Sequence, residues 1–175
     1  MKTQVTITII KDELCINAPY SAVNNKIYRE KGGRFNQRKS VWEFASTSTT
    51  EKMISELFGN INDLVETVVK MDQIDIQGAE WHIGGYKLAS RRGRDYNVEI
   101  PTGVQLKIGS FPSSGGSMKN PQVAGNVESM VLICARDFAE KENLEIIDIG
   151  VPVNPLAHFT YSELVLELMS RNVKV

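Results

Sequence analysis

Basic and aromatic side chains alternate in a short stretch of the N-terminal part of the chain, between residues 26 and 42. Basic side chains bind phosphates and aromatic rings stack on unpaired bases, so the mixture is typical of a surface that binds nucleic acid. The stretch holds six basic residues against one acid, Glu30. A solvated basic hairpin whose Trp42 belongs to the core is the alternative. The candidate binding residues of this first cluster are Lys26, Tyr28, Arg29, Lys31, Arg34, Phe35, Arg38, Lys39 and Trp42.

A second basic cluster lies further along the chain, at a turn that we expect between two strands. Loops often carry binding residues, so this cluster is predicted to extend the same nucleic-acid path. A solvated turn is the alternative interpretation. The cluster consists of Lys87, Arg91, Arg92 and Arg94, flanked by Tyr86 and Tyr96.

The elements that must position the first cluster can be assigned from local patterns. Alternating apolar residues predict a strand over residues 3–10, and a return strand over 13–17 completes a hairpin. A helix is expected over residues 20–31. It would start at Pro19, where the missing N–H costs little, and end at Gly32, because glycine adopts left-handed backbone easily.

A second hairpin and a second helix follow. The hairpin occupies residues 34–45, with a polar, basic tip at 36–39. The helix is predicted over residues 49–58, with Ser48 and Glu51 forming a capping box. The order ββα-ββα predicts one small sheet covered by two helices.

This pattern of strand, tyrosine, helix, Gly-Gly-Arg, hairpin, Trp-x-Phe and helix resembles the HARP domain, the accessory module of annealing helicases. The resemblance covers roughly residues 5–58, and it implies a small α+β module that contacts nucleic acid. Two features depart from the family: Ala45 stands where a proline is usual, and the helicase motor that follows the family domain does not fit in this chain. The residues that carry the resemblance are Ile16, Tyr20, Ile27, Lys31, Gly32, Gly33, Arg34, Phe35, Lys39, Val41, Trp42, Glu43 and Phe44.

The character of the chain changes after residue 72, where we place a boundary between domains 1–72 and 73–175. Residues 61–70 are ambiguous, because acids would cap a helix whereas valines favour a strand. Several short strands with Gly- and Pro-containing turns then predict a small antiparallel sheet or barrel. The candidate strands are 74–77, 80–88, 96–100, 103–109, 130–135 and 145–149.

Three further segments complete the predicted second domain. Residues 110–126 form a long loop, interpreted as a mobile insertion or as a segment that closes over a ligand. Residues 136–143 have the pattern of one or two helical turns. A final helix over about 161–171 has one apolar face, which either docks on its own domain or forms a homo-oligomer contact.

Charge is unevenly distributed along a chain that is nearly neutral as a whole. The net charge of the 175 residues is −1. Residues 80–120 carry six positive and three negative side chains, whereas residues 121–175 carry four and eight. The basic character is therefore local, which favours a defined binding surface over a globally basic protein.

Cysteine usage and hydropathy indicate the compartment. Cys15 and Cys134 are two lone cysteines in apolar settings and do not make a disulfide framework. The first ten residues lack the continuous apolar region of a signal peptide, and no run approaches the roughly 18 apolar residues of a membrane span. We therefore place the protein in the cytoplasm, with no membrane partner.

Motifs for catalysis are weak. The sequence lacks a P-loop and a dinucleotide fingerprint, and His82 and His158 lack metal-ligand spacing. Ser113, Ser114 and Ser117 lie near glycines without a nominated base. Asp95 and Glu99 could belong to a metal-dependent nuclease, but nothing distinguishes them from ordinary strand-end acids. We expect no cofactor, no metal and no enzymatic activity.

The sequence therefore predicts a two-part α+β protein that binds nucleic acid without chemistry of its own. Single-stranded DNA is the favoured ligand and RNA an alternative. A plasmid- or phage-type module that binds or inhibits an acidic protein partner is the second hypothesis, and a hydrolase is the third.

Overall fold

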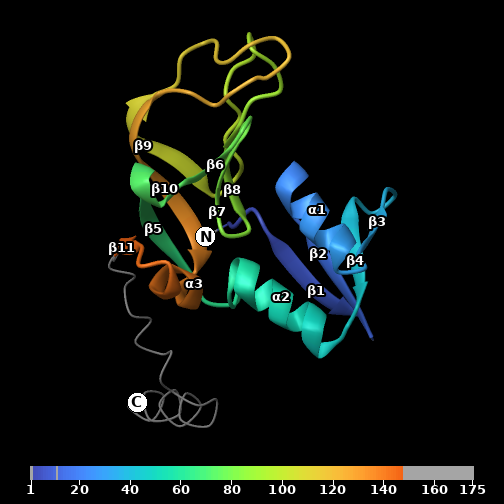
Figure 1. The fold of residues 1–175 in the computed structure, drawn as a ribbon. Helices are drawn as coiled ribbons and strands as arrows, with labels where there is room; N and C mark the ends of the chain where they lie inside the picture. The colour runs from blue at the N-terminus through green and yellow to red at the C-terminus, as the bar shows by residue number, and fades with distance from the viewer. Residues whose placement is uncertain (1, 11, 148–175) are drawn as a thin grey trace, which may run out of the picture.

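The computed structural model describes residues 2–10 and 12–147, and it confirms the α+β class. Three antiparallel sheets and three α-helices make up this part of the chain (Figure 1). The helices are α1 (Ala22–Glu30), α2 (Ser48–Phe58) and α3 (Arg136–Lys141), with a 3-10 turn η1 (Met71–Gln73). The strands are β1 (Thr6–Ile10), β2 (Glu13–Asn17), β3 (Arg34–Asn36), β4 (Val41–Ala45), β5 (Leu64–Lys70), β6 (Asp75–Gln77), β7 (Glu80–Ile83), β8 (Tyr86–Ser90), β9 (Val104–Ser110), β10 (Asn126–Ala135) and β11 (Glu145–Ile147).

The first sheet has the order β1-β2-β4-β3, and the predicted ββα-ββα arrangement is confirmed. Pairing of Ile16 with Trp42 and of Leu14 with Phe44 puts these apolar side chains on one face, because alternate residues of a strand point the same way. Helix α1 covers this face (Figure 1), and the Tyr28 ring meets Phe44 edge-on at 5.8 Å.

Helix α1 begins later than the sequence predicted. Ser21, not Pro19, caps it: the Ser21 hydroxyl accepts a hydrogen bond from the Asn24 N–H at 3.1 Å. At its other end Gly32 has a φ of +82°, which confirms the expected left-handed termination. A Cβ atom on Gly33 would lie 2.6 Å from the Phe44 ring, so the second glycine is required by close packing of the turn against the sheet.

Helix α2 is capped by a different pair from the one predicted. Thr47 and Thr50 form the capping box reciprocally, and Thr50 Oγ1 also donates to the Ala45 carbonyl at 2.8 Å. The predicted Ser48–Glu51 box is therefore wrong. Glu51 instead accepts a hydrogen bond from the Ser46 hydroxyl at 2.9 Å.

The second sheet has the order β11-β5-β10-β9. The ambiguous segment 61–70 contains strand β5, which pairs with β10 from Leu64 opposite Ala135 to Lys70 opposite Ser129. The predicted strand at 130–135 extends back to Asn126. Strand β5 precedes the proposed boundary at residue 72 but belongs to the later sheet, so the change of sheet occurs between α2 and β5.

The third sheet, β6-β7-β8, contains a hairpin that the sequence reading missed. The single strand predicted over 80–88 is two strands joined at Gly84 and Gly85. Gly84 has a φ of +53°, and a Cβ on either glycine would come within 3 Å of a Phe138 or Phe58 ring atom. The predicted strand at 96–100 is reduced to one bridge between Ser90 and Glu99.

A continuous core of buried side chains reaches all three sheets. Tyr86 is central to it: its hydroxyl donates to the Phe58 carbonyl at the end of α2 and accepts from the Ala135 N–H. Within the described residues the sheets are not closed into a barrel, so that alternative is wrong. No helix in the described part of the chain is long and apolar enough to cross a membrane. The predicted helix at 161–171 and its oligomer contact lie outside the described residues.

Candidate nucleic-acid interface

A pocket of about 360 Å³ opens between α1 and the β3–β4 hairpin. We call it the aromatic pocket. Its volume falls within the roughly 300–1,000 Å³ that is usual for ligand sites. Four residues of the predicted first cluster line it, together with six that the sequence reading did not select. The lining residues are Tyr28, Arg29, Phe35 and Trp42, then Asn17, Ala18, Pro19, Tyr20, Asn25 and Ser40.

The rings of this pocket form a graded series from core to surface. Tyr28 and Trp42 are buried and lie 5.4 Å apart, and Trp42 lies 5.5 Å from Phe35. Phe35 is 51% exposed and Tyr20 is 73% exposed. The core interpretation of Trp42 is therefore confirmed, and Tyr28 is removed from the exposed surface. Phe35 and Tyr20 are the rings that remain free to stack on a ligand.

The buried Tyr28 hydroxyl has no hydrogen-bond partner among the described residues. Burial raises the pKa of this phenol well above its usual range, so it stays protonated and remains a donor. A buried donor without a partner costs free energy.

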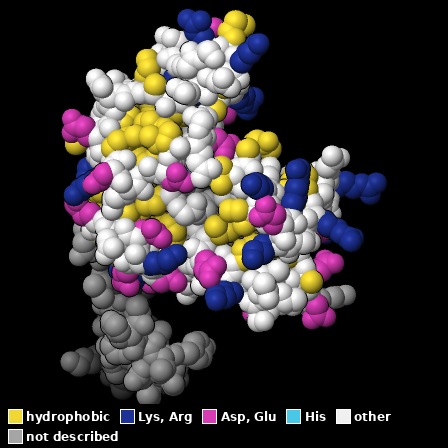
Figure 2. Space-filling view, viewed as in Figure 1, with side chains coloured by type: hydrophobic (Ala, Val, Ile, Leu, Met, Phe, Trp, Pro, Cys, Tyr) yellow, Lys and Arg dark blue, Asp and Glu magenta, His cyan; other side chains and the backbone are white. Residues whose placement is uncertain are grey.

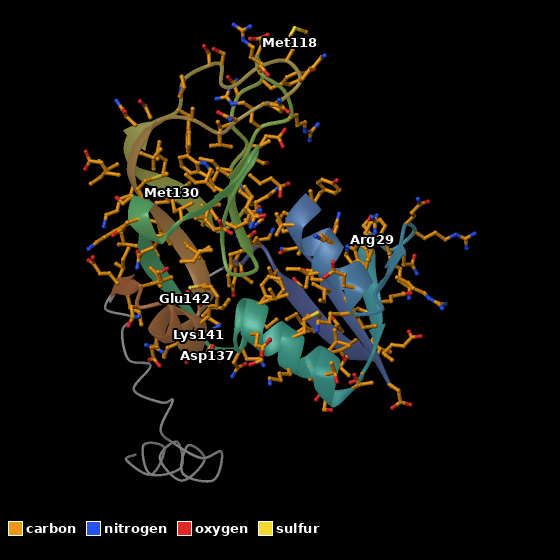
Figure 3. The ribbon with its side chains drawn as sticks, viewed as in Figure 1. Arg29, Met118, Met130, Asp137, Lys141 and Glu142 are labelled. Carbon is orange, nitrogen blue, oxygen red and sulfur yellow. The ribbon has the colours of Figure 1, made fainter. Side chains whose placement is uncertain are left out.

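Arg29 provides the positive charge at the aromatic pocket. It follows Asn25 and Tyr28 at helical spacing on one face of α1, and its guanidinium carbon lies 6.0 Å from the Trp42 ring centroid. Figure 3 shows Arg29 on α1 beside the hairpin. Dark-blue Lys and Arg side chains gather over α1 and this hairpin in Figure 2. Lys26, Lys31 and Arg38 are exposed on the same elements, whereas Lys39 is paired with Glu43 at 2.9 Å.

Arg34 lies on the other face of the first sheet. Arg34 lies opposite Glu43 in the register of strands β3 and β4, and the next residues along, Phe35 and Trp42, lie opposite each other. Side chains at neighbouring positions of a strand point to opposite faces, so Arg34 and Phe35 lie on different faces of the sheet. The surroundings of Arg34 include the acids Asp12, Glu13 and Glu43. Arg34 therefore does not belong to the basic-aromatic surface, contrary to the sequence prediction.

A second and larger pocket of about 520 Å³ adjoins the first. We call it the polar pocket. Residues Asn17, Ala18, Pro19 and Tyr20 line both pockets, so this segment is the wall between them. The polar pocket contains three cations, Lys2, Lys87 and Arg92, and one acid, Glu99, among its lining residues. The two predicted basic clusters are thus brought to adjoining sites.

Lys87 and Arg92 have different environments in the polar pocket. Lys87 is 8% exposed, and its ammonium donates to the Tyr20 carbonyl at 2.6 Å. Burial lowers the pKa of Lys87, while Glu80 and Glu99 act in the opposite direction from beyond ion-pair distance. Arg92 is exposed, and its Nε lies 2.9 Å from Glu99.

Arg91 and Arg94 do not join these pockets. Arg91 is 2% exposed, and its guanidinium donates to the carbonyls of Arg94, Tyr96, Pro112 and Ser113 at 2.6–3.2 Å. It holds two loops together and cannot reach a phosphate, contrary to the prediction. The same contacts anchor the start of the 110–126 loop, which also has a bridge from Gly116 to Pro121. Arg94 is exposed, and its Nε lies 3.6 Å from Asp95 Oδ1.

A buried polar cluster of Ser21, Glu80 and His82 lies where β7 meets the start of α1. Glu80 Oε2 accepts from the Ser21 hydroxyl at 3.0 Å, and Glu80 Oε1 accepts from the Ala22 N–H at 3.3 Å. His82 Nε2 lies 3.0 Å from Glu80 Oε2. No local motif pointed to this cluster, because Ser21 is 59 positions from Glu80 and 61 from His82.

The cluster has the residue types of a serine hydrolase but not its geometry. In a catalytic triad the serine and the acid bind opposite nitrogens of the imidazole. Here His82 Nε2 faces both Glu80 at 3.0 Å and Ser21 at 3.5 Å, and Nδ1 has no partner among the described residues. Ser21 is fully buried. The arrangement anchors the α1 N-terminus, where a carboxylate is favoured by the helix dipole.

Burial raises the pKa of Glu80, but hydrogen bonds from His82, the Ala22 N–H and Ser21 outweigh it, so its pKa lies below the usual range. Glu80 is therefore charged at neutral pH. Asn24 adds a second anchor of α1, donating from Nδ2 to the Gly85 carbonyl at 2.8 Å. Both contacts position the helix that carries Arg29 and Tyr28.

Comparison with known proteins finds no matching family model, no matching curated sequence and no matching solved structure. Within residues 2–10 and 12–147, no group of three or more His, Cys, Asp or Glu side chains could hold a metal ion.

Proposed function

We propose that this protein binds single-stranded nucleic acid, with single-stranded DNA the favoured ligand, through the face formed by α1 and the β3–β4 hairpin. The observation that carries the proposal is the aromatic pocket, which places the exposed rings Phe35 and Tyr20 beside the Arg29 guanidinium. An unpaired base has two free π-faces, and its phosphate carries one negative charge, so this combination suits a single strand.

Duplex DNA is a poorer fit to the same site. Its bases are stacked and paired, and extruding one costs a few kcal/mol. The surface is also small and the net charge of the chain is −1, so extensive neutralisation of a duplex backbone is not expected. The resemblance to the HARP domain remains a prediction that agrees with this proposal.

The test is fluorescence anisotropy with a labelled single strand of DNA, the matching duplex and an RNA of the same sequence, at two salt concentrations. We expect the single strand to bind most tightly. Its affinity should fall as the salt concentration rises, and a plot of log affinity against log salt concentration should have a slope of roughly −0.7 per phosphate contact. Arg29→Gln should weaken binding and make that slope shallower.

Arg34→Gln is the matched control, because Arg34 is also exposed but lies on the opposite face of the sheet. It should bind the strand as the unmodified protein does. No binding to any nucleic acid at low salt would overturn the proposal and favour a protein partner.

A further inference from the structure

Beyond the aromatic pocket, the structure contains a buried cation that has no ionic partner among the described residues. Lys87 lies in the wall of the polar pocket, and no carboxylate of the described residues comes within 4.0 Å of its ammonium. Burying a charge without a counter-charge is unfavourable. An ammonium has three donors, and among the described residues the Lys87 ammonium donates one hydrogen bond, to the Tyr20 carbonyl. Such a group is suited to receive an anion.

The rest of the polar pocket supports an anionic ligand. Lys2 and Arg92 add two exposed positive charges, and hydroxyl groups of Thr3, Thr6, Ser90 and Thr102 add possible donors. Glu99 is the one acid among the lining residues, and it is held by Arg92. Cations exceed acids by three to one in this pocket, so a phosphate group is the complementary ligand.

We propose that the polar pocket is a phosphate subsite and that a single nucleic-acid strand crosses the Tyr20 wall, with a base in the aromatic pocket and a neighbouring phosphate beside Lys87 and Arg92. This inference rests on the proposed function and assigns the strand a course between the two basic clusters. The Tyr20 ring, exposed between the pockets, stacks on the base at the crossing point.

Hydrogen bonds hold the aromatic pocket and the polar pocket in fixed positions relative to each other. Lys87 on β8 binds the Tyr20 carbonyl, and Glu80 on β7 binds the adjacent Ser21 and Ala22. Figure 1 shows this hairpin between α1 and the second sheet. The segment that separates the pockets is therefore held in place by hydrogen bonds from the third sheet.

The experiment measures binding of a labelled octamer of single-stranded DNA to the unmodified full chain, to three variants of the polar pocket, to one control variant and to Phe35→Ala in the aromatic pocket. Arg92→Gln should weaken binding about two- to fivefold, and Lys87→Met about tenfold. Each should make the salt slope shallower by roughly 0.7. Glu99→Gln should strengthen binding, because it releases Arg92. Lys107→Gln is the control, since Lys107 is exposed on β9, outside both pockets.

Three outcomes test this inference and the proposed function against each other. Unchanged affinity and slope in Arg92→Gln and Glu99→Gln, with binding still lost in Phe35→Ala, would overturn the phosphate subsite and leave the aromatic site standing. No binding by the unmodified protein would overturn both. Displacement of the octamer by an equimolar nucleoside monophosphate would make a mononucleotide the ligand and overturn the strand path. If Lys87→Met fails to fold, the Arg92→Gln and Glu99→Gln variants, at exposed positions, test the phosphate subsite without it.

Discussion

Phe35 shows how much a single side chain can contribute at this site. It is half exposed, yet it stands at the end of a series of packed rings that includes Trp42 and Tyr28. The buried rings hold Phe35 in place, so little conformational entropy is lost when a base stacks on it. Trp42 and Tyr28 contribute by packing, whereas the exposed face of Phe35 is available to a ligand.

Replacing Phe35 with alanine should therefore reduce affinity for single-stranded DNA with little loss of stability. We expect a loss of about 1–3 kcal/mol of binding free energy, the range for one base–aromatic stacking contact. Anisotropy titration measures the affinity and urea unfolding measures the stability. Tyr96→Leu, at an exposed ring outside both pockets, is the matched control and should bind normally. Normal binding by Phe35→Ala would contradict the assigned pocket.

Glu80 is the second residue with a measurable role. Its pKa is lowered in the folded state, so its contribution to stability is present above its unfolded pKa of about 4.3 and is lost as pH falls through the folded pKa. Glu80→Gln should cost about 1–3 kcal/mol of unfolding free energy near neutral pH.

The same substitution should also flatten the fall in stability below about pH 4.3. Urea unfolding of both proteins across this range measures the difference. Glu128→Gln, at an exposed position on β10, should retain the full pH dependence of the unmodified protein. Parallel pH profiles for the unmodified protein and Glu80→Gln would contradict the proposed role of the carboxylate.

At the scale of elements, the 110–126 loop is more ordered in its contacts than its composition suggested. Arg91 binds the carbonyls of Pro112 and Ser113 and also those of Arg94 and Tyr96, so one guanidinium ties two loops together. Met118 lies at the outer end of this segment (Figure 3) and is strongly exposed. An arginine with five N–H donors can serve several carbonyls at once.

Arg91→Gln should release this loop without affecting the binding site. We expect about 2–3 kcal/mol of destabilisation from the carbonyls left unpaired, and faster proteolytic cleavage between residues 110 and 126. Limited proteolysis with mass spectrometry locates the cuts. Affinity for single-stranded DNA should stay unchanged, in contrast to Arg92→Gln. Unchanged cleavage would show that the loop is held by other contacts.

At the scale of the whole molecule, the continuous core joins segments that the sequence assigned to two domains. The Tyr86 hydroxyl forms hydrogen bonds with the last residue of α2 and the last residue of β10. The Asn24 side chain of α1 donates a hydrogen bond to the carbonyl of Gly85, in the turn between β7 and β8. Trp42 lies in the first sheet and Trp81 in the third, and these are the two tryptophans of the chain. Each is a natural probe of its own sheet.

We expect the described core to unfold in one cooperative transition. Trp42→Phe and Trp81→Phe leave one tryptophan each, so their fluorescence reports on the third and the first sheet respectively. In each variant, the urea transition by fluorescence should coincide with that by circular dichroism. Separate transitions would instead support two domains, as the sequence reading predicted.

Local patterns in the sequence were enough to predict most of the helices and strands and the presence of a basic-aromatic cluster. The alternation of apolar residues in 3–10 predicted the first strand, and Gly32 predicted the end of α1. Both patterns involve only a few neighbouring residues, so they can be recognised without the tertiary structure. The α+β class follows from the order of these elements.

Which residues of the two clusters are exposed and which are structural depends on the tertiary fold. Arg34 points to the opposite face, the Arg91 guanidinium binds backbone carbonyls and Tyr28 packs in the core, although all three have the same residue types as the proposed binding residues. Glu80 and Ser21 meet across 59 positions. Burial and long-range pairing depend on contacts between distant segments, and no local pattern encodes those contacts.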